Sequence, residues 1–422
     1  MLKTITAILA LSAATLSTAA EPTYRVVVSL KERGERDFTA RLADIDAAQR
    51  RVGGRLDETR GRVTRAYQTI PAFAAEVTAQ GWAALANDPE VTKVDLDEAA
   101  VVASTSAGSV VGAAEVQTLG LTGKGVTVAV IDTGIDSTHP DLQGAIVDEA
   151  CFCVDASGKP CCPNGGSKEF GVGSARDEFG HGTHLAGIIA GRGRVAPLGF
   201  APDARIISIK VAGPNGSTST SSILAALDWL MTAHAEARVV NISMATTTAY
   251  AGTCDAASSV NTSFASAGRS LKGRGTVIVA AAGNAGLTDK MGAPACVSGY
   301  LAVGAVYSSN EGTVNANGCT DATTAVDRVA CFSNSSSALA ILAPGSGIVS
   351  TGIGGSLAVA SGTSQAAAIV SGTLALLMET ASNGASVDGA LRSTGVSVTD
   401  TRNSRVTGRV DARAALSALR AN

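Results

Sequence analysis

The chain has 422 residues, with 33 Lys and Arg against 36 Asp and Glu and a formal net charge of −3. This length exceeds one typical domain, so we expect a segment beyond a single core. The nearly balanced charge excludes a strongly basic surface, so neither nucleic acid nor a membrane is expected as a partner. The 47 glycines suit a tightly packed α/β protein with many turns.

The first 20 residues have the pattern of a secretory signal peptide. A charged start is followed by an apolar run from Ile5 to Leu16 and then by small residues. The run is shorter than the roughly 20 residues that a membrane-spanning helix needs. We therefore predict a signal peptide over 1–20, no membrane anchor, and a secreted protein, either extracellular or periplasmic.

Residues 21–103 are richer in charge and predict a small α+β domain. Strands are expected at 24–30, 63–70, 73–78 and 91–96, and helices at 37–52 and 82–87. The order β-α-β-β-α-β is the ferredoxin-like pattern. A polar stretch of small residues, 104–112, follows and suits an exposed linker.

A second, larger domain is predicted over residues 104–422. The apolar run that starts at Val126 indicates a strand buried on both faces, as in a parallel sheet, and it ends on Asp132. A buried carboxylate is costly without hydrogen-bond partners. Because ligands of open α/β sheets bind at the carboxyl ends of the strands, Asp132 is a candidate functional residue.

Four cysteines crowd one loop, where the chain has Cys151, Cys153, Cys161 and Cys162. Four thiols could hold zinc, but the expected secretion favours disulfides. We predict that the first two pair with the last two, because a bridge between adjacent cysteines is strained. The remaining candidate pairs are Cys254–Cys296 and Cys319–Cys331.

A histidine and a serine each open a small, apolar helix. His181 lies between two glycines, and Ser364 lies where a glycine-containing loop becomes a helix that runs toward Met378. Taken alone, the serine suits a simple helix cap. Together with Asp132, however, the two residues supply a nucleophile, a base and a carboxylate that orients the base.

The rest of the chain alternates predicted strands and helices. Strands are expected at 205–211, 239–245, 276–283 and 301–306, and a helix at 221–237. Asn284 follows the third of these strands, where a simple turn is the alternative to a functional role. This alternation predicts a doubly wound parallel sheet.

Three segments resemble the motifs of the subtilisin-like serine proteases. They are Val-Ile-Asp-Thr-Gly around Asp132, His-Gly-Thr-His from His181, and Ser-Gly-Thr-Ser-Gln-Ala-Ala around Ser364. Their chain order, Asp then His then Ser, is that of subtilisin. The resemblance covers residues 24–419, and one departure is Gln365, where the family usually has methionine. It implies a subtilisin-like, mostly parallel sheet with helices on both faces.

The resemblance also implies the site. Asp132, His181 and Ser364 match the catalytic triad, which hydrolyses peptide bonds through an acyl-enzyme and requires no cofactor. Asn284 matches the asparagine that stabilises the oxyanion. The expected substrate-binding residues are Ser243, Met244, Ala245, Ala282 and Gly283. Because these residues lack charge, we predict a preference for an apolar side chain at P1.

By position and pattern, residues 21–103 resemble the family's inhibitory propeptide, with an unrelated binding domain as the alternative. The resemblance implies a self-processing zymogen whose tail, 98–104, occupies the cleft and is cut between Val102 and Ala107. Asp141 matches a position that binds calcium in several relatives. The sequence therefore leaves two roles open for Asp141: it binds a structural calcium ion, or it is a solvated or hydrogen-bonded aspartate.

These expectations combine into a monomeric, secreted endopeptidase that acts on proteins or peptides and is inhibited by its own propeptide. One alternative is a binding protein that keeps the fold without turnover, against which the intact triad residues and Asn284 argue. The other is an esterase that uses the same acyl chemistry.

Overall fold

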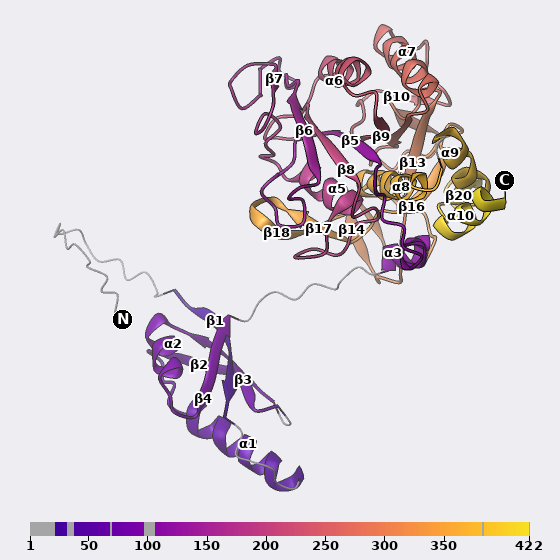
Figure 1. Ribbon diagram of the computed structural model, residues 1–422. Coiled ribbons are helices and arrows are strands. Elements are labelled where there is room, and N and C mark those ends of the chain that lie inside the picture. Colours follow the sequence, from indigo (N-terminus) through magenta and orange to yellow (C-terminus); the bar gives the residue numbers. More distant parts are fainter. Residues whose placement is uncertain (1–21, 32–37, 68–69, 97–105, 382–383, 422) are drawn as a thin grey trace. The chain divides into compact units, whose positions relative to one another are not determined.

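The computed structural model describes residues 22–31, 38–67, 70–96, 106–381 and 384–421. They form two compact units, divided between Val102 and Ala103 and traced in Figure 1. The predicted signal peptide, 1–20, and the predicted propeptide tail, 98–104, both lie outside the described residues. In the described ranges, every helix is too short or too polar to cross a bilayer.

The N-terminal unit is a four-stranded antiparallel sheet with two helices. Its elements are β1 (Tyr24–Leu30), α1 (Phe38–Gly53), β2 (Gly61–Ala66), β3 (Ala72–Val77), α2 (Ala79–Ala86) and β4 (Val91–Leu96). The strand order is β2-β3-β1-β4. Val26 and Val28 of β1 are buried in one cluster with Val52 of α1 and Leu85 of α2. The order of elements is as predicted, although the strand expected at 63–70 ends at Ala66.

The larger unit is built on a ten-stranded sheet in the order β19-β20-β16-β13-β11-β9-β5-β8-β6-β7. In chain order its strands are β5 (Thr127–Asp132), β6 (Ile146–Cys151), β7 (Glu169–Phe170), β8 (Arg205–Lys210), β9 (Ala237–Ile242), β11 (Val277–Ala281), β13 (Tyr300–Val306), β16 (Ile341–Pro344), β19 (Val396–Asp400) and β20 (Arg405–Arg409). The strands from β6 to β20 pair in parallel, and the outermost strands β7 and β19 pair antiparallel. The predicted fold class is confirmed.

Helices cover both faces of this sheet (Figure 1). They are α3 (Ser106–Val111), α4 (Ala113–Thr118), α5 (His181–Ala190), α6 (Thr220–Ala233), α7 (Ser259–Gly273), α8 (Thr363–Met378), α9 (Gly384–Ser393) and α10 (Ala412–Ala421). Val128 and Val130 of β5 pack in the core with α5 and α8, whereas Ala129 and Ile131 pack with α6 and α7. Successive strand residues point to opposite faces, so one strand supplies both cores. Helix α6 ends four residues before its predicted end, because Ala237 begins β9.

The winding of the sheet places the carboxyl ends of the neighbouring strands β8, β5 and β9 together. β5 lies between β8 and β9, and the chain returns to it from opposite sides of the sheet. Crevices at such a reversal are where open α/β sheets bind ligands. Helix α8 is buried along all 16 residues, as expected from its small, apolar sequence. Three small antiparallel pairs border the sheet: β10 (Ala249–Ala251) with β12 (Lys290–Gly292), β14 (Val314–Ala316) with β15 (Cys319–Asp321), and β17 (Ile348–Gly352) with β18 (Ser356–Ala360), the last pair joined by the 3₁₀ turn η1 (Ile353–Gly355).

Candidate active site

Asp132 and His181 meet at the carboxyl end of β5. Asp132 is fully buried, and its Oδ1 lies 2.7 Å from Nδ1 of His181. The same oxygen accepts a hydrogen bond from the backbone N–H of Thr133 at 2.8 Å. Because Nδ1 faces a carboxylate, it carries the proton, and Nε2 of His181 is left as the basic nitrogen. The His181 side chain keeps 24% of its surface exposed, so it borders solvent.

Glycines allow this close approach. Gly134 has a φ of +97°, and a Cβ at this position would lie 2.2 Å from the carbonyl oxygen of Ala175. A Cβ on Gly182 would lie 2.1 Å from the carbonyl oxygen of Gly134. A larger residue at Gly182 would push the start of α5 away from the end of β5, and one at Gly134 would push away the segment of Ala175 that leads to α5. The glycines of the two sequence motifs therefore set the distance between Asp132 and His181.

A second carboxylate, that of Asp177, caps helix α5. Its Oδ1 accepts from the backbone N–H groups of Phe179 and Gly180, and its Oδ2 accepts from the N–H and hydroxyl of Thr183. These bonds satisfy donors that a helix N-terminus otherwise leaves unpaired. Burial lowers the pKa of His181, but the charge and hydrogen bond of Asp132, with the charge of Asp177, outweigh it. The pKa of His181 is therefore raised above its usual value.

The second histidine of the same motif has a different environment. His184 is 2% exposed, and its Nε2 lies 3.1 Å from the carbonyl oxygen of Ile348. Burial, with a smaller contribution from the charge of His181, lowers the pKa of His184 to about 4. His184 thus stays neutral at physiological pH, whereas His181 can change its charge.

Ser364 lies in the first turn of α8 and is 6% exposed. Its hydroxyl donates to the carbonyl oxygen of Ser243 at 3.3 Å, and its own carbonyl oxygen accepts from the Ser243 hydroxyl at 3.1 Å. Across the described residues, no hydrogen bond joins this hydroxyl to His181. Catalytic hydrogen bonds are often long before substrate binds, so this arrangement does not separate the two residues functionally.

Asn284 is held beside the nucleophile loop by its carbonyl oxygen. Oδ1 accepts from both the N–H and the hydroxyl of Thr363, at 2.8 and 2.9 Å. The amide nitrogen Nδ2 lies on the side of Gly362, where an added Cβ would be only 3.1 Å away. Because Oδ1 is engaged by Thr363, the amide nitrogen is the group of Asn284 that lies beside Gly362.

The predicted substrate-binding residues follow β9 and β11. Ser243 is buried, Met244 is half-buried and Ala245 is exposed, whereas Ala282 is buried and Gly283 is half-buried. The methyl of Ala245 would lie 3.9 Å from a Cβ at Gly283. The segments after β9 and β11 are therefore neighbours at this edge of the sheet.

Two buried residues of the site, Asn334 and Lys210, were not indicated by any sequence motif. Asn334 donates to the carbonyl of Ala282 and accepts from the N–H groups of Ala285 and Leu287, which fixes the loop that carries Asn284. Its spacing from β11 gives no hint of this contact.

Lys210, at the end of β8, is fully buried, and its Nζ donates to the carbonyl of Thr133 at 2.9 Å. Burial lowers the pKa of Lys210, which the charge of Glu178 partly opposes. The Glu178 carboxylate lies 3.8 Å from Nζ. A lysine at the end of a predicted strand would ordinarily be expected in solvent, so the sequence gave no reason to place it under the Asp132 turn.

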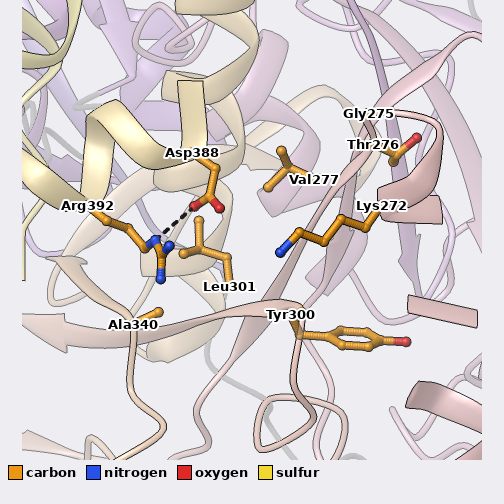
Figure 2. A pocket seen from close by; sticks show the side chains of 10 residues that line it. Lys272, Gly275, Thr276, Val277, Tyr300, Leu301, Ala340, Asp388 and Arg392 are labelled. Atoms are coloured by element: carbon orange, nitrogen blue, oxygen red, sulfur yellow. Dashed lines mark ion pairs between the residues drawn. The ribbon is translucent and has the colours of Figure 1, made fainter. Parts of the chain in front are cut away.

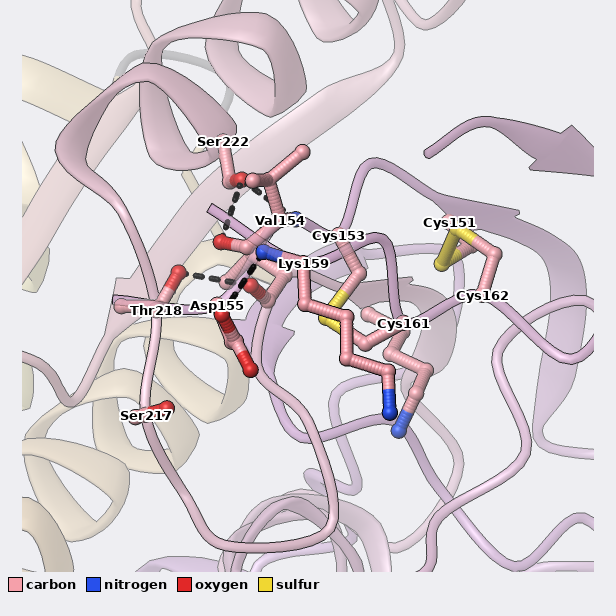
Figure 3. Close-up of a disulfide and its surroundings, with 12 residues drawn as sticks. Cys151, Cys153, Val154, Asp155, Lys159, Cys161, Cys162, Ser217, Thr218 and Ser222 are labelled. Carbon is pink, nitrogen blue, oxygen red and sulfur yellow. Dashed lines mark hydrogen bonds between the residues drawn. A yellow bond between two sulfur atoms is a disulfide. The ribbon is translucent and has the colours of Figure 1, made fainter. Parts of the chain in front are cut away.

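The crowded cysteines form two nested disulfides, Cys151–Cys162 and Cys153–Cys161 (Figure 3). The predicted pairing is confirmed, as are Cys254–Cys296 and Cys319–Cys331. The cysteine loop supports the start of α6, because the N–H of Val154 donates to the Ser222 hydroxyl and the Val154 carbonyl accepts from the N–H of Ser219. With all four thiols of the loop in disulfides, the zinc alternative is wrong.

Asp141 is surrounded by donors rather than by oxygens. Its carboxylate accepts from the backbone N–H groups of Arg194, Val195 and Ala196, the last at 2.7 Å. Calcium needs six to eight oxygen ligands. The surroundings of Asp141 supply N–H groups and two nearby arginines instead, so they do not fit a cation. The described ranges also contain no cluster of three or more His, Cys, Asp or Glu suited to a metal.

A charged cavity of about 90 Å³ lies at the opposite, amino edge of the sheet (Figure 2). Its walls include Lys272, the first residues of β11 and β13, and Asp388 and Arg392 of α9. Oδ1 of Asp388 is 3.5 Å from Nε of Arg392 and has no hydrogen-bond partner. None of the predicted site residues lines this cavity.

At the carboxyl edge of the doubly wound sheet, a buried carboxylate bonds an imidazole, and an anchored amide bonds the residue before the serine at the start of α8. Comparison with known proteins identifies the family. A profile described as the subtilase family matches residues 123–408. The chain is 33% identical over 304 residues to an alkaline protease of Alkalihalobacillus alcalophilus, covering 71% of this chain and 67% of the relative.

Two further relatives agree. Subtilisin E of Bacillus subtilis (strain 168) is 31% identical over 330 residues, covering 76% of this chain and 74% of the relative. The crystal structure of a cold adapted subtilisin-like serine proteinase matches with a TM-score of 0.52 and 26% identity, covering 69% of this chain and 90% of that one. The chain therefore belongs to the subtilase family and is a subtilisin-like serine endopeptidase.

Proposed function

We propose that Ser364 is the nucleophile, His181 the general base and Asp132 the carboxylate that orients and stabilises the imidazole. The hydrogen bond of 2.7 Å between Asp132 and Nδ1 of His181 is the observation that carries this assignment. It leaves Nε2 to accept the Ser364 proton. In the reaction the hydroxyl turns from the carbonyl of Ser243 to Nε2 and attacks the peptide carbonyl. His181 then returns the proton to the departing amine, and water releases the acyl group.

Asn284 completes the proposed site. Its Nδ2 and the backbone N–H of Ser364 donate to the oxygen that becomes negative in the tetrahedral intermediate. The two hydrogen bonds that Thr363 donates to Oδ1 support this role, because they fix the amide before substrate binds. A donor fixed in advance needs no reorganisation during the reaction. No cofactor is needed for this chemistry.

The substrates we propose are proteins and peptides with an apolar P1 side chain. Ser243, Met244, Ala245, Ala282 and Gly283 bring no charged group to the expected pocket. The segment after β9 would pair with the substrate as an added strand. A peptide library varied at P1 tests the preference, and dominant cleavage after Lys, Arg or Asp would contradict it.

We also propose that the enzyme is secreted as a monomeric zymogen. The support is the signal-like sequence over 1–20 and the separate α+β unit, which has the ferredoxin-like order of elements. In this proposal residues 21–103 inhibit the catalytic unit and are removed by self-cleavage between Val102 and Ala107. Expression of the Ser364→Ala variant should leave the full-length precursor uncut, as seen by mass spectrometry.

A fluorophosphonate probe tests the proposed nucleophile. The mature protein should be labelled on Ser364, and Ser364→Ala should not be labelled. Ser371→Ala is a control, because this serine is buried in the same helix and its hydroxyl bonds only to Asn241. Casein hydrolysis compared with short-chain ester hydrolysis then separates a protease from an esterase. Labelling without cleavage of any protein would contradict the proposed function.

A further inference from the structure

The hairpin of β14 and β15 has no part in the site described above. Its turn is Asn317-Gly318, with φ of +51° and +78° at these two residues. Two-residue turns of this Asn-Gly type favour a tight hairpin, because both positions need positive φ. The hairpin is also short, with three residues in each strand. Two strands alone are marginally stable, so the position of this hairpin depends on its anchors.

The hairpin is fixed to the core beside its turn, through Cys319, and at its far end, through Asp321. The Cys319–Cys331 disulfide joins β15 to the segment that precedes Phe332. Asp321, the last residue of β15, accepts from the Tyr307 hydroxyl at 2.7 Å, from the Cys331 N–H at 2.9 Å and from Arg328 at 2.8 Å. Tyr307 is itself fully buried. These contacts therefore fix the orientation of the hairpin relative to the core.

The tip of the hairpin reaches the chain that leads to the nucleophile. Nδ2 of Asn317 donates to the carbonyl oxygen of Ser361 at 2.8 Å, three residues before Ser364. The loop that precedes β14 is also tied to this region, because Glu311 accepts from the Ser346 hydroxyl at 2.8 Å.

The order of the strands decides which part of a substrate would meet the hairpin. The expected substrate-binding residues Ser243 to Ala245 follow β9, and Asn284 follows β11. The hairpin follows β13, and Glu311 in the loop before it bonds to Ser346 after β16. These strands are neighbours in that order. An extended peptide runs in two opposite directions from the carbonyl held at Asn284. If its acyl part lies over β9, its leaving part runs toward β13, where the hairpin lies.

This side also offers a strand edge. β18 pairs with β17 along one edge, and its Leu357 and Val359 side chains are 40% and 54% exposed. An exposed edge is where an extended peptide can add as a further strand. The carbonyl of Ser361, which continues this edge toward the nucleophile, is already occupied by Asn317.

We infer that the β14–β15 hairpin is the wall of the cleft on the leaving-group side, and that Asn317 limits recognition there by occupying the Ser361 carbonyl. The inference rests on the proposed function of Ser364. Asn317 is a specificity-determining residue for the part of the substrate beyond the scissile bond. Asn317 does not affect recognition of the acyl part of the substrate, which runs over β9.

Two substrates with the same acyl part test this inference. One ends in a p-nitroanilide, and the other continues for three residues beyond the scissile bond. In Asn317→Gly the amide is lost but the positive φ is kept. We expect the ratio of kcat/KM for the long substrate to that for the anilide to rise about three- to tenfold, the range of one hydrogen bond. The anilide alone should change less than twofold.

Asn315→Gly is the matched control, because Asn315 bonds within the hairpin to the Thr320 hydroxyl. It should leave the ratio unchanged. Asn317→Asp keeps positive φ accessible but cannot donate from its side chain, so it should also raise the ratio. A ratio that stays constant or falls in Asn317→Gly overturns the inference. Fluorophosphonate titration of each variant counts active sites, so failure of wild-type labelling would instead overturn the proposed function.

Discussion

Each of the two edges of the central sheet carries a partly or fully buried aspartate. The two aspartates differ in their hydrogen-bond and ion-pair partners. At the carboxyl edge, Asp132 is hydrogen-bonded to His181 and to the N–H of Thr133. At the amino edge, Oδ1 of Asp388 lies 3.5 Å from Nε of Arg392 and has no hydrogen bond. Oδ2 of Asp132 also has no hydrogen bond, so the difference lies in the imidazole and the N–H that meet Oδ1 of Asp132. The carboxyl edge also receives the N-termini of α5 and α8, whose unpaired N–H groups favour negative charge.

The comparison shows how a parallel sheet concentrates function. All parallel strands end at the same edge, and the helices that follow begin there, so polar strand-end residues and helix N-termini converge. The opposite edge collects helix C-termini and strand starts. A charge buried there, such as Asp388, meets few compensating donors.

The largest expected effect is the loss of a triad residue at the carboxyl edge. Ser364→Ala and His181→Ala should lower kcat by about 10⁶, the magnitude known for subtilisin itself. Asp132→Asn should lower kcat by about 10⁴, the magnitude known for the same change in the chymotrypsin-type triad. Circular dichroism should show an unchanged fold. A residual kcat within tenfold of wild type would contradict the assignment.

The pH profile sharpens the same test. His181 is an active base only when neutral, so activity falls as pH decreases through its raised pKa. Asp132→Asn removes the charge that raises this pKa. The acid limb of kcat/KM for the residual activity should therefore move to lower pH. A limb that stays in place would mean that another group titrates there.

The next largest effect concerns the amide beside the nucleophile. Asn284→Ala should lower kcat by about 10²–10³ with little change in KM, because the donor acts on the charge of the transition state. Asn284→Asp keeps an oxygen that accepts from Thr363 but loses the N–H₂ group. If this variant retained full activity, Asn284 would serve only to hold Thr363.

A smaller effect, on stability, is expected at Asp141. This residue belongs to neither of the two clusters compared above, and its carboxylate accepts from backbone N–H groups. Asp141→Asn should destabilise the protein by roughly 2 kcal/mol, because N–H groups that now bind a carboxylate lose a charged acceptor. Chelation with EDTA should leave the melting temperature unchanged. A fall of the melting temperature in EDTA, reversed by calcium, would contradict the N–H environment described above.

The smallest effect is expected at the amino edge. Burial raises the pKa of Asp388, although Arg392 and Lys272 oppose this. A folded-state pKa above the unfolded value of 3.8 means that ionisation opposes folding at neutral pH, and the penalty disappears at lower pH. Asp388→Asn should therefore raise stability at pH 7 by roughly 1 kcal/mol or less, and not at pH 3.

Calorimetry at the two pH values measures this change. Asp289→Asn, the same substitution at an exposed position, should change nothing. A loss of stability in Asp388→Asn would show that its ion pair with Arg392 outweighs the cost of burial.

Local sequence patterns predicted much of the fold. The unbroken apolar run before Asp132 indicated a strand buried on both faces, and β5 is such a strand. The small residues after Ser364 indicated a buried helix, and α8 is buried throughout. These features depend on side-chain size and periodicity, which are properties of contiguous residues. The end of α6 was predicted too late, because the start of β9 depends on pairing with other strands.

By itself, the sequence indicated the order of the elements, which cysteines are bridged, and the candidate residues Asp132, His181, Ser364 and Asn284; the structure decided which of Cys161 and Cys162 pairs with Cys151. Only the tertiary structure decided what surrounds them: Lys210 buried under the turn after Asp132, Asn334 holding the Asn284 loop, and N–H groups rather than oxygens around Asp141. The physical reason is that these contacts join residues far apart in the chain. Whether a polar group is paired or left alone depends on such neighbours, and spacing along the chain does not contain them.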